Sequence, residues 1–148
     1  PANGKVRAAI YYATNINAPS GTFTVTANPL GTGTSLTIEA AEYSGISAAS
    51  PLDSSVTLTG SSSSPATGSL TTTGANRLLI AIAVANPDAT SVNWTEDPTW
   101  NQRVEETNNW ERQAGHGVDK LVTATSAYSH TWTTSASGPW STVLAAFK

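Results

Sequence analysis

Three tryptophans that lie close together in the sequence are the residues best suited to bind a ligand. Trp94, Trp100 and Trp110 fall within seventeen positions, beside the polar residues Asn101 and Glu105. Exposed indole rings can stack on the CH groups of a sugar while neighbouring amide and carboxylate groups bind its hydroxyls. This arrangement predicts a carbohydrate-binding platform. The alternative is that the large rings fill the core or an interface between subunits.

The histidines and acidic residues offer few ligands for a metal ion. His116 and Asp119 are three positions apart, but a transition-metal site usually needs three or four ligands. We therefore expect no metal site and no other cofactor. A calcium ion bound by loop oxygens stays open as an alternative, with Asp53, Asp88 and Asp97 as its candidate ligands.

Pairs of carboxylates raise glycoside hydrolysis as a further alternative, because that reaction needs two carboxyl groups across a cleft. Glu105 and Glu106 are adjacent, so on a strand they point to opposite faces. Only Glu111 or Asp119 could complete a pair with Glu105, and only if the fold brings them together. The chain also has no Gly-x-Ser-x-Gly, phosphate-binding or His-Glu-x-x-His motif. We expect no enzymatic activity.

The elements that must position these residues are strands. In the segment 22–26, Phe23 and Val25 alternate with three threonines, as in a half-buried strand. The run Leu78–Val84 is apolar on both faces, which predicts a central strand covered on both sides. The pattern predicts an all-β fold, an antiparallel β-sandwich of Ig-like or jelly-roll type. About ten strands are expected, over residues 6–13, 22–26, 35–39, 55–59, 66–73, 78–84, 101–107, 118–125, 128–134 and 141–147.

The expected core consists of the apolar members of these strands. They are Phe23, Val25, Leu36, Ile38, Val56, Leu58, Leu78, Ile80, Ile82 and Leu144, together with Trp132 and Trp140.

Length and composition limit the class of protein. The 148 residues suit one domain, spanning 1–148. A net charge of −3 and an isoelectric point near 5.2 argue against a nucleic-acid binder. No apolar run approaches the roughly 20 residues of a membrane span, so we expect no membrane insertion. The chain has no cysteine and no methionine. It therefore forms no disulfide or zinc–thiolate site, and it suits an oxidising exterior.

Short motifs along nearly the whole chain carry a resemblance to a known family. They are Ile10-Tyr11-Tyr12-Ala13, Ala41-Glu42-Tyr43-Ser44-Gly45, Ser50-Pro51-Leu52-Asp53, Ala75-Asn76-Arg77-Leu78-Leu79 and Ala145-Ala146-Phe147-Lys148. The chain resembles a poorly characterised β-sandwich module of secreted and cell-surface bacterial proteins. The resemblance implies an extracellular or cell-surface location in bacteria, and it brings no catalytic residues.

The chain departs from that family at one point. Members usually carry further strands before the segment that here begins at Ile10. A sandwich without those strands exposes an unpaired edge and part of its core. We hypothesise that a neighbouring copy supplies the missing strand, which builds a fibre when repeated head to tail. The alternative is that the chain closes its own sheet.

These observations predict a non-enzymatic, extracellular structural or adhesive module whose partners are copies of itself. The alternative function is a carbohydrate-binding module with a polysaccharide as its partner. The expected contact residues for self-association lie in the first and last predicted strands. They are Val6, Ala8, Ile10, Tyr12, Val143 and Phe147.

Overall fold

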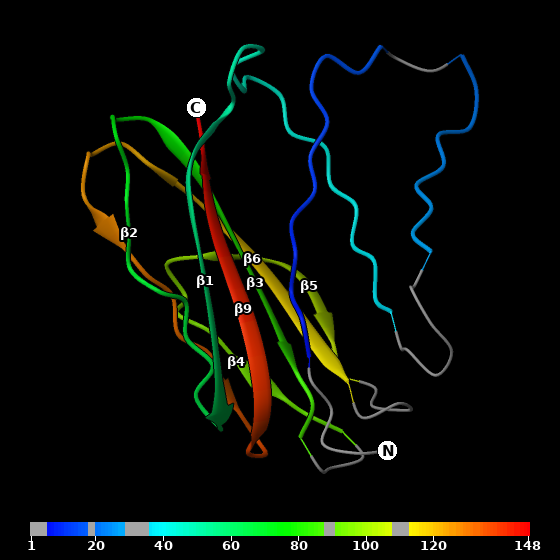
Figure 1. The fold of residues 1–148 in the computed structure, drawn as a ribbon, viewed down its shortest axis with the longest axis vertical. Coiled ribbons are helices and arrows are strands. Elements are labelled where there is room, and N and C mark those ends of the chain that lie inside the picture. The colour runs from blue at the N-terminus through cyan, green and yellow to red at the C-terminus, as the bar shows by residue number, and fades with distance from the viewer. Residues whose placement is uncertain (1–5, 18–19, 29–35, 88–90, 108–112) are drawn as a thin grey trace.

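A computed structural model describes residues 6–17, 20–28, 36–87, 91–107 and 113–148. These residues form nine strands and no helix (Figure 1). The fold is all-β with antiparallel sheets, as the alternation predicted. None of the described residues belongs to a helix with the length and hydropathy that a membrane span requires.

The main sheet has five strands in the order β1-β9-β3-β6-β5, and every neighbouring pair is antiparallel. The run Leu78–Val84 lies within the middle strand, which confirms its predicted central position. The strands are β1 (Leu52–Ser62), β3 (Arg77–Ala85), β5 (Asn101–Glu106), β6 (Ala114–Val122) and β9 (Gly138–Phe147).

A thin second layer covers one face of the main sheet, which we call the inner face. It contains two short sheets, β2 (Leu70–Thr71) with β7 (Ala127–Tyr128) and β4 (Trp94–Thr95) with β8 (Thr133–Thr134). Between the two layers lies the larger core cluster. Its residues include Leu79, Ala81, Val92, Trp94, Trp100, Val118, Trp132, Trp140 and Leu144.

The opposite, outer face is covered by the N-terminal segment, in which the described residues form no strand. A smaller cluster of Leu78, Ala145 and Phe147 packs there against side chains such as Ile10 and Tyr43. Two hydrogen bonds attach this segment to β9 and the residue after it. The Ala8 amide donates to Ser141 Oγ at 3.2 Å, and the Ser47 amide donates to the Lys148 carbonyl at 2.6 Å.

The strands expected at 6–13, 22–26 and 35–39 are not found. Residues 6–13, 22–26 and 36–39 form no strand, and residue 35 lies outside the described residues. The alternation shows which side a residue would face, but a strand also needs a neighbouring strand to bond with, and the described residues offer these segments none. Their apolar side chains are therefore exposed instead of forming the expected core. They are Phe23, Val25, Leu36 and Ile38.

The remaining expected strands are confirmed in outline, although β6 begins at Ala114 and ends at Val122 instead of spanning the expected 118–125. Leu78, Leu144, Trp132 and Trp140 are buried, whereas Leu58 is 42% exposed. The longer strands expected at 66–73 and 128–134 shrink to β2, β7 and β8, with one isolated bridge between Ala66 and Thr131. Val56, Ile80 and Ile82 are half-buried.

Candidate functional site

The predicted sugar platform is not formed by its first two tryptophans. Trp94 and Trp100 are only 7% and 6% exposed, and both belong to the core cluster. Their rings have no open face on which a sugar could stack. The neighbouring Asn101 and Glu105 are exposed on β5. Trp110 lies outside the described residues.

The buried rings form an aromatic cluster between the two layers. Trp132 lies at its centre, with ring centroids 4.3 Å from His130 and 6.4 Å from both Trp94 and His116. Trp100 closes the cluster, 4.8 Å from His130. The indole N–H of Trp132 donates to Nδ1 of His116 at 3.1 Å. This bond assigns the proton of neutral His116 to Nε2, which faces a Glu96 carboxylate oxygen at 3.3 Å.

Both histidines of this cluster are held neutral. Burial lowers the pKa of His116, and the carboxylates of Glu96 and Glu105 oppose this only in part. Burial lowers the pKa of His130 to about 4, against the opposing effect of Asp97. Neither ring nitrogen of His130 has a hydrogen-bond partner among the described residues. The cluster is therefore packed within the core.

Asp119 is the buried polar centre of the outer face. Its carboxylate accepts hydrogen bonds from Tyr43 Oη at 2.9 Å, from Asn101 Nδ2 at 3.0 Å and from two guanidinium nitrogens of Arg103 at 2.5 and 3.0 Å. Burial alone would raise the pKa of Asp119, but these bonds hold it below its usual range. Asp119 therefore ties the N-terminal segment and β5 to β6, and its oxygens are already bound.

The carboxylate pair considered for a hydrolase does not form from the described residues. Glu105 is paired with His116 in the ladder of β5 and β6, so its side chain lies on the inner face. Asp119 is three residues further along β6 and lies on the outer face. Glu111 lies outside the described residues.

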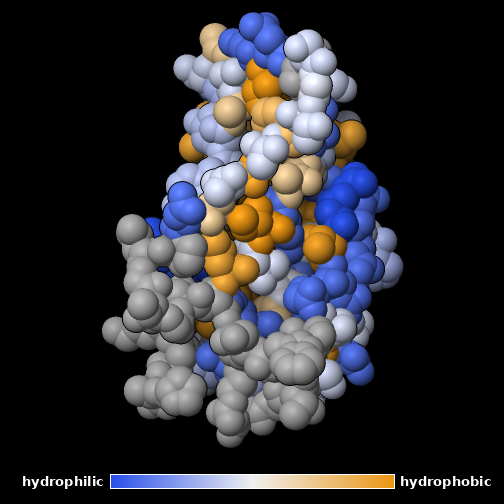
Figure 2. Space-filling view, turned by 90° about the vertical axis from the view of Figure 1, so that its right-hand side faces the viewer, coloured by the Kyte–Doolittle hydropathy of each residue, from blue (hydrophilic) through white to orange (hydrophobic). Residues whose placement is uncertain are grey.

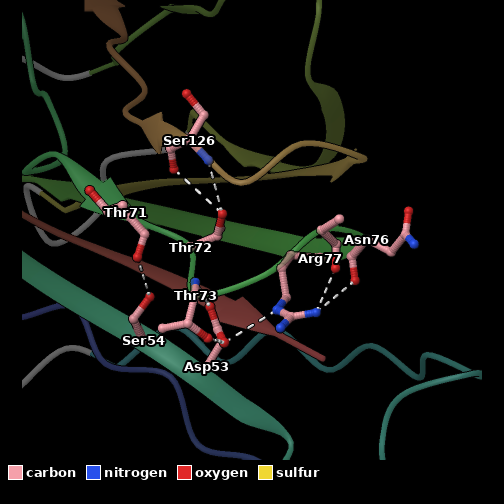
Figure 3. A network of polar contacts seen from close by, with 9 residues as sticks. Asp53, Ser54, Thr71, Thr72, Thr73, Asn76, Arg77 and Ser126 are labelled. Atoms are coloured by element: carbon pink, nitrogen blue, oxygen red, sulfur yellow. Dashed lines mark hydrogen bonds and ion pairs between the residues drawn. The ribbon is translucent and has the colours of Figure 1, made fainter.

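The candidate calcium ligands are also separate from one another. Asp53 lies in a network that joins β1, β2 and β3 (Figure 3). Its carboxylate pairs with Arg77 Nε at 3.2 Å and accepts from the Thr73 amide at 2.8 Å. Asp97 accepts from the Thr99 amide, and Asp88 lies outside the described residues. Within the described part of the chain, no three His, Asp or Glu residues gather as metal ligands would.

Several of the residues expected to contact a neighbouring copy are covered within the chain. Ala8, Val143 and Phe147 are buried within the chain. Tyr12 lies edge-on to Phe147, with ring centroids 5.5 Å apart. Val6 and Ile10 are half-buried. The outer face of β9 needs an apolar cover and the N-terminal segment supplies it, which leaves little of this surface for a second copy.

The edge of the main sheet at β1 is open. Among the strands that the structure describes, β9 is the one partner of β1 over its 11 residues. The chain that follows β1 bonds elsewhere, because the Thr67 amide donates to the His130 carbonyl and the Thr72 amide to the Ser126 carbonyl. Among the described residues, no backbone hydrogen bond from another segment reaches the edge of β1 that points away from β9. Apart from Asp53, β1 carries no charged residue.

The other edge, β5, is protected. It is six residues long and carries Arg103, Glu105 and Glu106, and its pairing with β6 is interrupted between Gln102 and Val104. Short length, charge and an irregular ladder all discourage the addition of another strand. The two edges therefore differ in what they can bind.

The sequence predicted an unpaired edge but assigned the contact to the first and last expected strands instead of β1, and it gave no sign of the Asp119 cluster. Tyr43 and Asp119 are 76 positions apart, so no local spacing relates them. The edge had a signal that could have been used. The sequence from 54 to 76 contains no charged residue, which is unusual for a strand facing solvent.

No family model and no curated protein matches the chain. Among solved structures, the chain is similar to the tripod from the baseplate of bacteriophage Tuc2009. The TM-score is 0.43 and the sequence identity 11%, over 90% of this chain and 84% of that chain. The resemblance to a bacterial surface module stays a prediction.

Proposed function

We propose that this chain is a non-enzymatic structural module that assembles with copies of itself through the edge of β1. The observation that carries the proposal is that edge, which is 11 residues long and nearly free of charge. Among the described residues no strand is hydrogen-bonded to it on the side away from β9, although Asp53 and Ser54 at its start bond to the chain around Thr71. Exposed edges of this kind pair readily with another chain. The proposal includes an extracellular location on bacteria, which is supported by the sequence motifs and by the absence of cysteine and methionine.

The proposal is supported further by the other candidate site residues, several of which have structural roles inside the chain. The tryptophans Trp94 and Trp100 are in the core, and the carboxylates of Asp53 and Asp119 are bound internally. We find no specific observation that favours carbohydrate binding as a second function.

The test is the mass of the purified chain in solution. We expect sedimentation velocity to show assemblies that grow with concentration through the micromolar range. Thr57→Lys places a charge in the middle of the open edge and should abolish assembly. The matched control, Thr123→Lys, adds the same charge at an exposed residue just after β6 and should leave assembly intact. A native chain that stays monomeric at all concentrations would overturn the proposal.

A further inference from the structure

We infer that residues 22–26 of one copy occupy the β1 edge of the next copy, as an added strand. The inference rests on the proposed function and names the segment that makes the contact. Phe23 and Val25 are 59% and 51% exposed. No hydrogen bond between described residues ties 20–28 to the main sheet. The segment thus has the alternation of a strand but no ladder to join.

The residue pattern of 22–26 matches that of β1. Thr22-Phe23-Thr24-Val25-Thr26 and Ser55-Val56-Thr57-Leu58-Thr59 both alternate a hydroxyl residue with an apolar one, and neither carries a charge. Val56 and Leu58 pair with Leu144 and Thr142 of β9, so their side chains lie on the inner face. A strand added in register would place Phe23 and Val25 beside them and extend the core outwards. Leu58, which is 42% exposed, would gain an apolar neighbour.

The two partners cannot meet within one chain in this structure. Figure 1 shows residues 20–28 in blue, running along the side of the molecule away from β1, with the rest of the main sheet between them. Figure 2 shows the side that carries this segment, where apolar atoms run down the middle between polar flanks. A second copy is therefore the occupant that the arrangement fits. Because one copy offers its edge and the other its segment, the contact repeats head to tail.

The neighbouring apolar segment is less free to leave. It holds Leu36 and Ile38, but the carboxylate of Glu39 lies against β6, where a Cβ built on Gly117 would come within 2.7 Å of Glu39 Oε2. A few residues later Tyr43 is bonded to Asp119. This anchoring leaves 22–26 as the segment able to reach a second copy.

Disulfide cross-linking tests the contact directly, since the chain has no cysteine of its own. Thr24 and Thr57 are the central residues of 22–26 and 55–59. When these two segments pair along their full length, Thr24 lies opposite Thr57 whether the strands are parallel or antiparallel. Directly opposite residues place their Cβ atoms about 4.5–5.5 Å apart, close to the roughly 3.5–4.5 Å that a disulfide needs. We expect a chain with Thr24→Cys and a tagged chain with Thr57→Cys to form a mixed disulfide. Glu105→Cys on the protected edge is the control in place of Thr57→Cys and should not cross-link.

The outcomes separate the inference from the function on which it rests. A mixed disulfide no more abundant than the Glu105→Cys control overturns the inference. Cross-linking of Thr57→Cys to itself in assembling protein would show that β1 pairs with β1, which overturns the inference and keeps the proposed function. A native chain that stays monomeric overturns both.

A second variant guards against effects of the cysteines. Phe23→Asp should abolish assembly without changing the free energy of unfolding, because Phe23 is exposed and outside the core. Tyr11→Asp is its matched control, since Tyr11 is also an exposed aromatic residue but lies outside 22–26. Mixing Phe23→Asp with Thr57→Lys leaves one intact edge and one intact segment, so the mixture should stop at a dimer. Continued growth of Phe23→Asp alone would contradict the inference.

Discussion

At the scale of residues, His130 couples the aromatic cluster to pH. An unfolded histidine binds a proton near pH 6.5, whereas burial holds the pKa of His130 in the fold at about 4. Between these values the unfolded state binds more protons than the folded state. His130 therefore lowers the free energy of unfolding as pH falls through this window, and its own contribution levels off below it. The shift corresponds to about 3 kcal/mol.

The variant His130→Phe tests this linkage. It keeps a ring between Trp100 and Trp132 but cannot take up a proton. We expect urea unfolding between pH 7 and pH 4 to show a shallower loss of stability in the variant than in the native chain. Some slope remains, because the pKa of His116 is also lowered. Equal slopes for both chains would contradict the assignment.

Asp119 should contribute more to the free energy of unfolding than any single residue that it binds. Asp119→Ala removes the acceptor of Tyr43, Asn101 and Arg103 together, and we expect a loss of about 1–3 kcal/mol in the free energy of unfolding. Tyr43→Phe removes one hydrogen bond and should cost about 1 kcal/mol. Urea unfolding at pH 7 measures both. If Tyr43→Phe cost as much as Asp119→Ala, the carboxylate would not be the centre of the cluster.

At the scale of elements, Gly60 is required by the packing of β1 on β9. It lies opposite Trp140, and a Cβ at Gly60 would overlap the six-membered part of the Trp140 ring. We expect Gly60→Ala to lower the free energy of unfolding by about 1–3 kcal/mol. Gly21→Ala is the control, because a Cβ there meets no atom within 4 Å. The two variants should separate clearly in thermal unfolding, and equal midpoints would argue against this packing.

The strands also show which parts of the fold can be predicted from the sequence. The apolar run Leu78–Val84 predicted a central strand, because few environments accept apolar residues on both faces. The alternation at 22–26 predicted a half-buried strand, but Phe23 and Val25 are exposed and the segment forms no strand, because a period of two does not by itself supply a pairing partner. Trp94 and Trp100 show the same limit, since a platform and a core use the same residue type. Only the packing of the two layers decides between these uses.

At the scale of the whole molecule, the proposed assembly should be insensitive to salt. The segments 22–26 and 55–59 carry no charge, so screening by ions removes no attraction between copies. We expect the sedimentation profile to change little between low and high ionic strength. A marked dissociation at high salt would point to a contact made by charged residues elsewhere.

The two faces of the main sheet are covered by different means, and this difference has a consequence for backbone amide hydrogen exchange. Over the inner face the covering layer is tied by backbone bonds such as Trp132 to Pro65, whereas the described residues covering the outer face form no strand. Amides of β3, bonded on both sides, should exchange slowest, while those of the N-terminal segment should exchange through local opening. The layer over the inner face would then exchange more slowly than the segment over the outer face, and binding of a second copy would first slow exchange at 22–26.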